Sequence, residues 1–202
     1  SNSVNKKKIL LIIGGAGGVG SWALTLARAW HPSLHIVATA STTLQQEWCT
    51  SLGADQVMTH DQIGTKLKGG RTGSVDTILC LTEPVKSLFA TCSEVIKPYG
   101  SICLVVAGQS IEALNLGFAF FKCANIMTQT VFSSIRTDYR RIVPSNELAA
   151  MVQMLAQQTI VAPISPDLDV VVSESIKDAT KPDGVLAALS QVSGQRRGKF
   201  VL

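Results

Sequence analysis

Five glycines within seven residues are the part of this sequence whose spacing points most directly to chemistry. They lie in Gly14–Gly20, directly after the apolar run Ile9–Ile13 and directly before a helical pattern from Ser21 to about Trp30. Residues 15, 17 and 20 satisfy G-x-G-x-x-G between a strand and a helix. In that context the motif is typical of a loop that binds the pyrophosphate of a dinucleotide.

Each glycine of the motif has its own expected role. Gly15 permits the tight turn, Gly17 lets the backbone approach the pyrophosphate, and Gly20 lets the helix pack closely on the strand. The free N–H groups and the positive dipole end of the helix then face the phosphates. The alternative is a glycine-rich turn and nothing more. The residues predicted to bind the cofactor in this loop are Gly15, Ala16, Gly17, Gly18, Val19 and Gly20.

The residues after the second expected strand, His35–Ala40, bear on which dinucleotide is bound. Domains that prefer NAD place an acidic residue there, which holds the ribose 2′-OH. Here Ser41 and Thr42 follow the strand, and the first acid is Glu47, inside the next helix. Hydroxyls without a carboxylate favour NADP(H) over NAD(H). The same hydroxyls also suit a turn that caps the helix, and both roles are compatible.

Four more residues at strand ends are candidates for contacts with the cofactor, because ligands of such sheets bind at the carboxyl ends of the strands. His60 is expected to end the third strand, where it either approaches the adenosine end of the cofactor or is merely exposed. Thr82 follows the fourth strand, and Ala107 ends the fifth. Phe132 ends the sixth strand and is equally suited to the core. The catalytic residues stay unknown, since no proton-transfer pair is evident.

The elements that must position these residues alternate between strand and helix. The expected strands are 9–13, 35–40, 56–60, 75–81, 101–107 and 125–132, and the expected helices are 21–30, 44–52, 85–97 and 117–123. Such alternation predicts an α/β fold with a parallel sheet. Six strands suit the Rossmann-type doubly wound order 3-2-1-4-5-6.

Composition agrees with a sheet that is covered on both faces. Charged residues make up 16% of the 202 residues, and the mean hydropathy is +0.28. Parallel strands buried on both faces read as continuous apolar runs, as these do. No run reaches the ~18 apolar residues that a membrane span needs. The net charge of +4 comes from small basic clusters without interleaved aromatic residues, so no nucleic-acid partner is expected.

The cysteines indicate a reduced, cytoplasmic protein. There are five, an odd number without a C-x-x-C pair, which disfavours both a disulfide framework and a zinc cluster. The first eight residues contain no signal peptide and read as a tag remnant or linker. A dinucleotide-binding domain is expected over 9–160. The tail, 161–202, does not continue the βα rhythm and is expected to be a small C-terminal segment of a second domain.

Three stretches resemble the medium-chain dehydrogenase/reductase superfamily, most closely its quinone-oxidoreductase branch with the zinc-type alcohol-dehydrogenase-like proteins. Ile13–Gly20 resembles the phosphate loop of that branch, and Leu52–Thr59 resembles its Leu-Gly-Ala-Asp entry to the third strand. Gly194–Leu202 resembles its C-terminal Gly-Lys-x-Val-Leu strand. In related enzymes a tyrosine stands at the place of His60. They often carry Lys or Arg just after the second strand, where this chain has glutamines.

The resemblance implies a two-domain oxidoreductase that transfers hydride between NADP(H) and a small quinone, enone, aldehyde or alcohol. The large N-terminal part of its catalytic domain would precede residue 1, together with any zinc ligands and most substrate contacts. This chain would then bind cofactor, bind no zinc, and be inactive alone. Two alternatives remain: an NADP(H)-sensing or scaffold module without turnover, and a methyltransferase, which would require an acid at the end of the second strand.

The sixth strand predicts a homodimer. In the expected order it is an edge strand that is apolar, β-prone and free of proline and charge, so it is prone to pair with another chain. Antiparallel pairing of 125–132 with its own copy would satisfy its open hydrogen bonds, and relatives often dimerise along this edge. The alternative is that a later segment of the same chain covers the strand.

Overall fold

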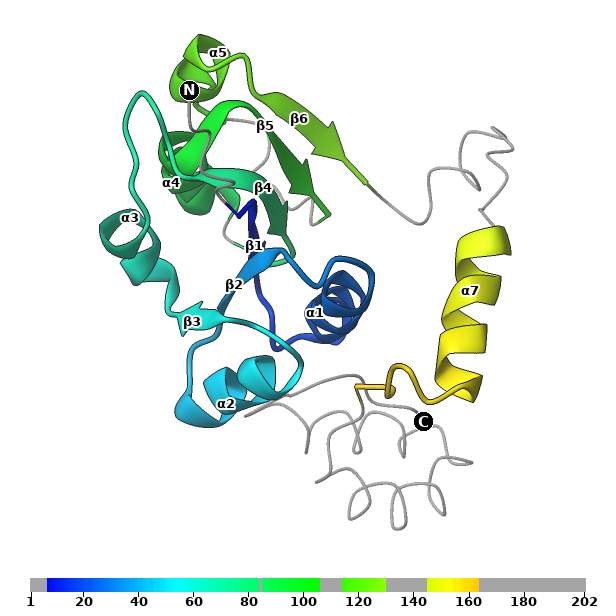
Figure 1. The fold of residues 1–202 in the computed structure, drawn as a ribbon. Coiled ribbons are helices and arrows are strands. Elements are labelled where there is room, and N and C mark those ends of the chain that lie inside the picture. The colour runs from blue at the N-terminus through cyan, green and yellow to red at the C-terminus, as the bar shows by residue number, and fades with distance from the viewer. Residues whose placement is uncertain (1–6, 84, 106–113, 130–144, 164–202) are drawn as a thin grey trace, which may run out of the picture.

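The computed structural model describes residues 7–83, 85–105, 114–129 and 145–163. In this part a six-stranded, all-parallel sheet has the order β3-β2-β1-β4-β5-β6 (Figure 1), which confirms the Rossmann-type prediction. The strands are β1 (Ile9–Ile13), β2 (His35–Thr39), β3 (Gln56–Met58), β4 (Val75–Cys80), β5 (Ile96–Leu104) and β6 (Asn125–Thr128). The helices are α1 (Gly18–Trp30), α2 (Thr43–Ser51), the 3-10 helix η1 (His60–Gln62), α3 (Ile63–Lys66), α4 (Val85–Val95), α5 (Gly117–Phe121) and α7 (Ser145–Ala156).

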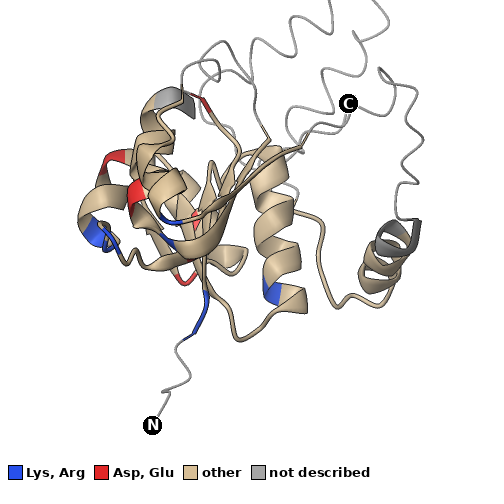
Figure 2. Ribbon diagram, turned by 90° about the horizontal axis from the view of Figure 1, so that it is seen from above, with Lys and Arg blue, Asp and Glu red and all other residues tan. Residues whose placement is uncertain are grey.

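Two apolar cores lie on opposite faces of the sheet. Along β1 the side chains alternate: Leu11 and Ile13 join the core that includes Phe89 of α4, and Ile12 joins the core that includes Leu24 of α1. All five side chains are buried. Seen from above, helices lie on both sides of the sheet, and charged positions are sparse (Figure 2). Because helices cover both faces, both sides of the central strands are buried, and these strands are therefore continuously apolar.

The first helix begins earlier than its sequence pattern predicts. It starts at Gly18, three residues before the expected Ser21, so its first turn belongs to the glycine loop itself. The amide of Ser21 closes that turn by donating to the carbonyl oxygen of Gly17 at 2.8 Å. The backbone amides of a helical first turn are therefore part of the loop.

The third strand is shorter than predicted, and His60 does not end it. The strand stops at Met58, and His60 opens the short helix η1. Thr59 caps this helix, with Gln62 Oε1 accepting from the amide of Thr59 at 3.3 Å. This local capping outweighs the strand tendency of the residues that precede it.

The fourth helix and fifth strand also meet earlier than predicted. The helix was expected to reach Lys97, but it ends at Val95, and Ile96 already pairs with Val75 of β4. The register shifts between Val75 and Thr77, since Ser101 is the next residue of β5 to pair. Ladder pairing at Ile96 therefore decides the boundary, rather than Pro98.

The remaining predictions lie partly outside the described residues. Strand β6 is confirmed over Asn125–Thr128, whereas 130–132 are not described. Helix α7 covers Ser145–Ala156, after the undescribed residues 130–144. The C-terminal segment is described only as far as Pro163, so its assignment to a second domain stays a prediction. Over the described ranges, no helix combines the length and apolar character that a membrane crossing requires.

Candidate dinucleotide-binding site

The glycine loop is fixed to the neighbouring strand by its own backbone. Gly14 has φ +86°, so the residue that needs glycine's conformational freedom at the turn is Gly14, one position before the expected Gly15. Its amide donates to Thr39 Oγ1 at 2.9 Å, and the amide of Gly15 donates to the carbonyl oxygen of Thr39 at 3.0 Å. Thr39 is the fully buried last residue of β2.

The three motif glycines differ in how much space surrounds them. A Cβ at Gly20 would overlap the carbonyl oxygens of Gly14 and Gly15, so α1 can approach the loop only with glycine there. At Gly15 a Cβ would lie 3.0 Å from the Cβ of Ala38. At Gly17 it would meet only the carbonyl oxygen of Gly14, at 3.5 Å. The fold therefore has room for a side chain at Gly17.

The start of α1 presents backbone donors. The amides of Gly18, Val19 and Gly20 donate to no oxygen within the described part of the chain. Val19 is 61% exposed, so the turn is open to solvent at this residue, whereas Gly20 is buried against the loop. Unpaired amides at a helix N-terminus, combined with the positive end of the helix dipole, suit a phosphate group.

Ser41 and Thr42 form the cap of α2. Thr42 Oγ1 accepts from the amide of Gln45 at 3.3 Å. Gln45 Oε1 accepts in turn from the amides of Ser41 at 3.2 Å and Thr42 at 3.3 Å. The capping role that the sequence allowed is therefore present, and it places both hydroxyl residues at the carboxyl end of β2.

His60 lies close to that same end of the sheet. The amide of Ala40 donates to the carbonyl oxygen of Met58 at 3.0 Å, so the ends of β2 and β3 are side by side, and His60 follows two residues later. Its side chain is half-buried, and burial lowers the pKa of His60 below its ordinary value, opposed by the charge of Asp61. A neutral imidazole is thus favoured beside the expected adenosine end.

Thr82 lies against the glycine loop. A Cβ at Gly14 would be 3.4 Å from the Cβ of Thr82, and the amide of Leu81 donates to the carbonyl oxygen of Ile13 at 3.0 Å. Thr82 is therefore next to the turn, at the carboxyl end of β4. Ala107 and Phe132 lie outside the described residues, so their predicted contacts are not placed.

Two residues that support the site were missed in the sequence. Thr39 is the only polar residue in the apolar stretch Ile36–Ala40. A single polar residue in a buried strand indicates a hydrogen-bonding role, and this was the signal in the sequence that could have identified it. Ser21 is fully buried in α1, and its Oγ accepts from Trp48 Nε1 of α2 at 3.0 Å. This bond joins α1, whose first-turn amides are unpaired, to α2, the helix that Thr42 caps.

Metal and thiol chemistry have no evident place here. Among the described residues, no group of three or more His, Cys, Asp or Glu side chains is arranged to hold a metal ion. All five cysteines are free thiols. Burial raises the pKa of Cys49, which lies behind Gly15, to about 12, so it remains protonated and acts as a small apolar side chain.

The strand order and the position of the glycine loop define a Rossmann-type α/β fold. No protein-family model matches the chain. The chain is 38% identical over 112 residues to the zinc-type alcohol dehydrogenase-like protein SAS2087 of Staphylococcus aureus. It is 37% identical over 115 residues to a zinc-type alcohol dehydrogenase-like protein of Staphylococcus epidermidis. These matches cover 55% and 56% of this chain, and 32% and 33% of the relatives.

Solved structures share the fold. One, assigned as a zinc-dependent alcohol dehydrogenase from Rhizobium etli, has a TM-score of 0.67 at 23% identity over 100% of this chain and 57% of its own. The quinone oxidoreductase of Coxiella burnetii has a TM-score of 0.63 at 18% identity over 95% and 52%. A mycobacterial protein complexed with NADPH has a TM-score of 0.60 at 17% identity over 81% and 50%.

The curated relatives confirm the resemblance to zinc-type alcohol dehydrogenase-like proteins, and the solved structures confirm the fold. The matched region spans about a third of the length of the curated relatives.

Proposed function

We propose that this chain is the NADP(H)-binding domain of a medium-chain oxidoreductase that transfers hydride to or from a small quinone, enone, aldehyde or alcohol. The observation that carries the proposal is the open first turn of α1. Its three unpaired amides at Gly18, Val19 and Gly20 follow the glycine loop at the carboxyl end of β1. Gly14 of that loop lies next to Thr82, at the end of the neighbouring strand. A dinucleotide bound there would place its pyrophosphate on these amides.

Binding of NADPH, measured by isothermal titration calorimetry, tests this assignment with a variant that spares the fold. Gly17→Val places a side chain in the space where the pyrophosphate would meet the backbone, whereas only one protein atom lies within 4 Å of the new Cβ. We expect loss of NADPH binding with an unchanged circular-dichroism spectrum. The matched control is Gly64→Val on α3, where the nearest side-chain atom is 3.7 Å from the new Cβ. Native affinity in Gly17→Val would show that the phosphate loop is misassigned.

The preference for NADP(H) rests on Ser41 and Thr42 and on the lack of an acid beside them. Gln45 Oε1 engages the amides of both residues, so a 2′-phosphate must either displace this side chain or bind through the hydroxyls. The structures of several similarly folded proteins contain NADP or NADPH. Comparing the dissociation constants of NADPH and NADH decides the point, and tighter binding of NADH would reverse the preference.

Hydride transfer belongs to the longer protein in this proposal. In cofactor-dependent oxidoreductases the protein supplies binding and orientation, and the nicotinamide supplies the hydride. A polypeptide that contains this chain and an upstream catalytic domain should reduce quinones or enones with NADPH, and this chain alone should not. Equal activity of the longer polypeptide and of this chain alone would contradict the assignment of hydride transfer to the longer protein. A longer protein that binds NADPH but reduces none of these substrates would favour the sensing or scaffold alternative.

We further propose a homodimer formed along β6. All four residues of this edge strand are exposed, with Ile126 at 39% and Met127 at 49%. Thr128→Lys puts a charge on the edge and should yield a monomer in analytical ultracentrifugation. Thr65→Lys, at an exposed position of α3, is the control that adds the same charge elsewhere. A monomeric wild type, or a dimer that survives Thr128→Lys, would rule this arrangement out.

The free cysteines favour a reducing compartment, and we propose that the protein is cytoplasmic.

A further inference from the structure

A hollow lies on the surface at the end of the sheet away from the glycine loop. Arg71, Asn115, Gly117, Phe118 and Phe121 line it, and it has a volume of about 360 Å³. Arg71 belongs to the segment that leads into β4, and the other four precede β6, so the hollow is at the amino ends of these strands. The glycine loop follows the carboxyl end of β1. A ligand in the hollow would therefore leave the dinucleotide site free.

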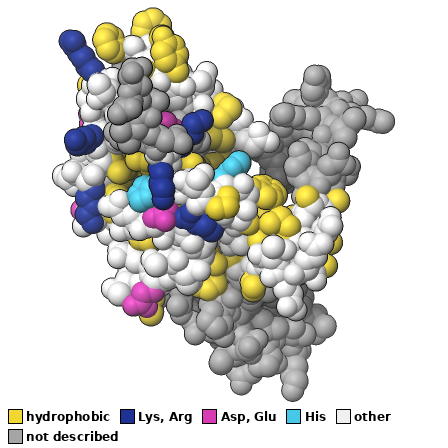
Figure 3. Space-filling model, in the orientation of Figure 1, with side chains coloured by type: hydrophobic (Ala, Val, Ile, Leu, Met, Phe, Trp, Pro, Cys, Tyr) yellow, Lys and Arg dark blue, Asp and Glu magenta, His cyan; other side chains and the backbone are white. Residues whose placement is uncertain are grey.

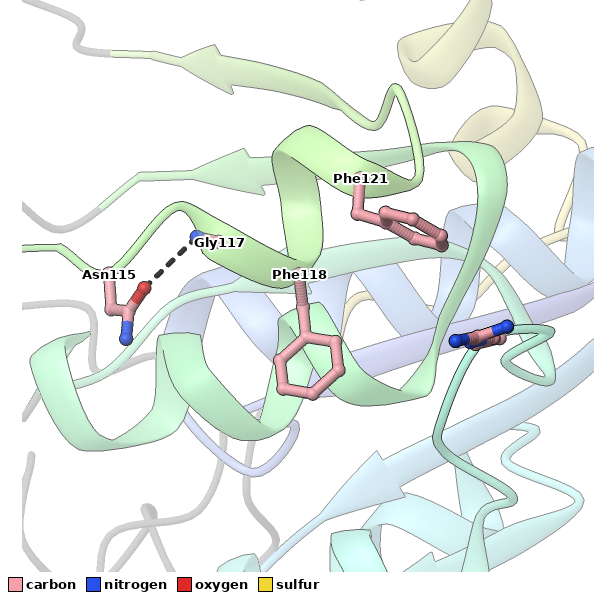
Figure 4. Close-up of a pocket in the computed structure, with 5 residues that line it drawn as sticks. Asn115, Gly117, Phe118 and Phe121 are labelled. Atoms are coloured by element: carbon pink, nitrogen blue, oxygen red, sulfur yellow. Dashed lines mark hydrogen bonds between the residues drawn. The ribbon is translucent and has the colours of Figure 1, made fainter.

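The walls of this hollow are aromatic. Phe118 and Phe121 project from α5, and Asn115 lies before the helix (Figure 4). Phe118 is 48% exposed and Phe121 65% exposed, which is unusual for side chains of this size. On the surface, hydrophobic side chains gather at the top of the molecule over α5, with Lys and Arg side chains along the adjoining edge (Figure 3).

A positive charge without a counter-ion completes the hollow. The guanidinium of Arg71 lies 5.8 Å from the centroid of the Phe121 ring. No ion pair involves Arg71 within the described residues, and none of the five lining residues is acidic. Lys66 and Lys68 are exposed on the same segment and add to the positive potential. Asn115 Oδ1 accepts from the amide of Gly117 at 3.0 Å. The Nδ2 group of Asn115 takes no part in this bond and can donate to a ligand.

We propose that this hollow binds a small molecule with a flat apolar body and one carboxylate, such as an aryl carboxylate. The rings of Phe118 and Phe121 provide faces for stacking, and Arg71, held over Phe121 by a cation–π contact, provides the charge that pairs with the carboxylate. The volume lies within the range of small-molecule sites, at its lower end. The site is independent of the proposed dinucleotide site.

Titration with 2-naphthoate, followed by ¹H–¹⁵N NMR, tests the proposal, and 2-naphthamide serves as the uncharged probe of the same shape. Saturable shifts are expected at the amides of Gly117, Phe118 and Phe121, unchanged when NADPH is also present. The amide probe should bind about fivefold more weakly, as expected for loss of one exposed ion pair. No saturable shifts, or shifts confined to the glycine loop, would overturn the proposal.

Two variants distinguish recognition of the carboxylate charge from unselective binding of apolar molecules. Arg71→Gln keeps much of the side-chain length and should weaken naphthoate about fivefold while leaving naphthamide unchanged. Lys68→Gln removes a neighbouring exposed charge that does not line the hollow, and it should change naphthoate affinity by less than about twofold. Equal naphthoate affinity in Arg71→Gln and wild type would show that the aromatic surface binds apolar molecules without selecting an anion, which contradicts the proposal.

Discussion

The amide of Gly14 donates to Thr39 Oγ1 at 2.9 Å, and this bond fixes the glycine loop to the end of β2. Gly14 has a positive φ, and Thr39 has no exposed surface. The loop and the strand end that precedes Ser41 and Thr42 are thus joined through one buried residue, Thr39, by its side chain and by its backbone carbonyl. Their spacing determines where a dinucleotide could bridge them.

Thr39→Val should destabilise the protein and weaken NADPH binding. Valine has the same shape but cannot accept from the amide of Gly14, and an unpaired buried donor costs about 1–3 kcal/mol. Urea denaturation measures the free energy of unfolding, and calorimetry measures the affinity. Thr39→Ser retains the hydroxyl and should preserve more of both. Equal losses in the serine and valine variants would show that the methyl group matters rather than the hydrogen bond.

Gly20→Ala should be far more damaging to the fold than Gly17→Ala. The new Cβ at position 20 would overlap the backbone carbonyl groups of Gly14 and Gly15. These backbone atoms can make room for it only if the whole loop moves. We expect a loss of about 3 kcal/mol in the free energy of unfolding. Gly17→Ala should cost about 1 kcal/mol or less, because the new Cβ has space. Similar thermal midpoints for both variants would contradict the close approach of α1 to the loop.

Lys122→Met should destabilise the junction of α4 and β5. The buried ammonium of Lys122 donates to the carbonyl oxygens of Ser93 at 2.9 Å, Glu94 at 2.7 Å and Ile96 at 2.7 Å. Methionine fills a similar volume but leaves three acceptors at a helix end without this donor, which should cost about 3 kcal/mol. Lys66→Met, at an exposed position, is the control and should change stability by about 0.5 kcal/mol or less. Equal urea midpoints for the two variants would show that water replaces the ammonium.

His60 should make stability depend on pH. Burial lowers its pKa in the folded state below the ordinary value of 6.5, so the unfolded state binds more protons between the two pKa values. The free energy of unfolding should therefore fall as pH drops below about 6.5 and through the folded-state pKa. Urea denaturation of wild type and His60→Gln from pH 7.5 to pH 5 isolates this contribution. A stability difference between the two proteins that is independent of pH would contradict it.

Sequence pattern was sufficient for the elements whose signals are local. The apolar run Ile9–Ile13 followed by glycines determined β1 and the loop, and the alternation of apolar runs with helical patterns determined the strand order. The glycine loop depends on the backbone freedom of glycine, and the strands depend on burial of apolar side chains. The residue types in the sequence show both properties directly. The capping of α2 by Thr42 was also readable, because a cap needs only residues close in sequence.

Tertiary structure decided the features that depend on residues far apart in the chain. The end of α4 at Val95 follows from pairing of Ile96 with Val75, and the carbonyls there are held by Lys122, 26 to 29 residues away. The attachment of the loop to Thr39 spans 25 residues. Such contacts form only after the chain has packed, because the two partners are far apart in the sequence. A short stretch of sequence therefore does not include both of them. The sequence by itself therefore determined that a glycine loop joins β1 to α1, and the packed sheet determined which residues hold that loop in place.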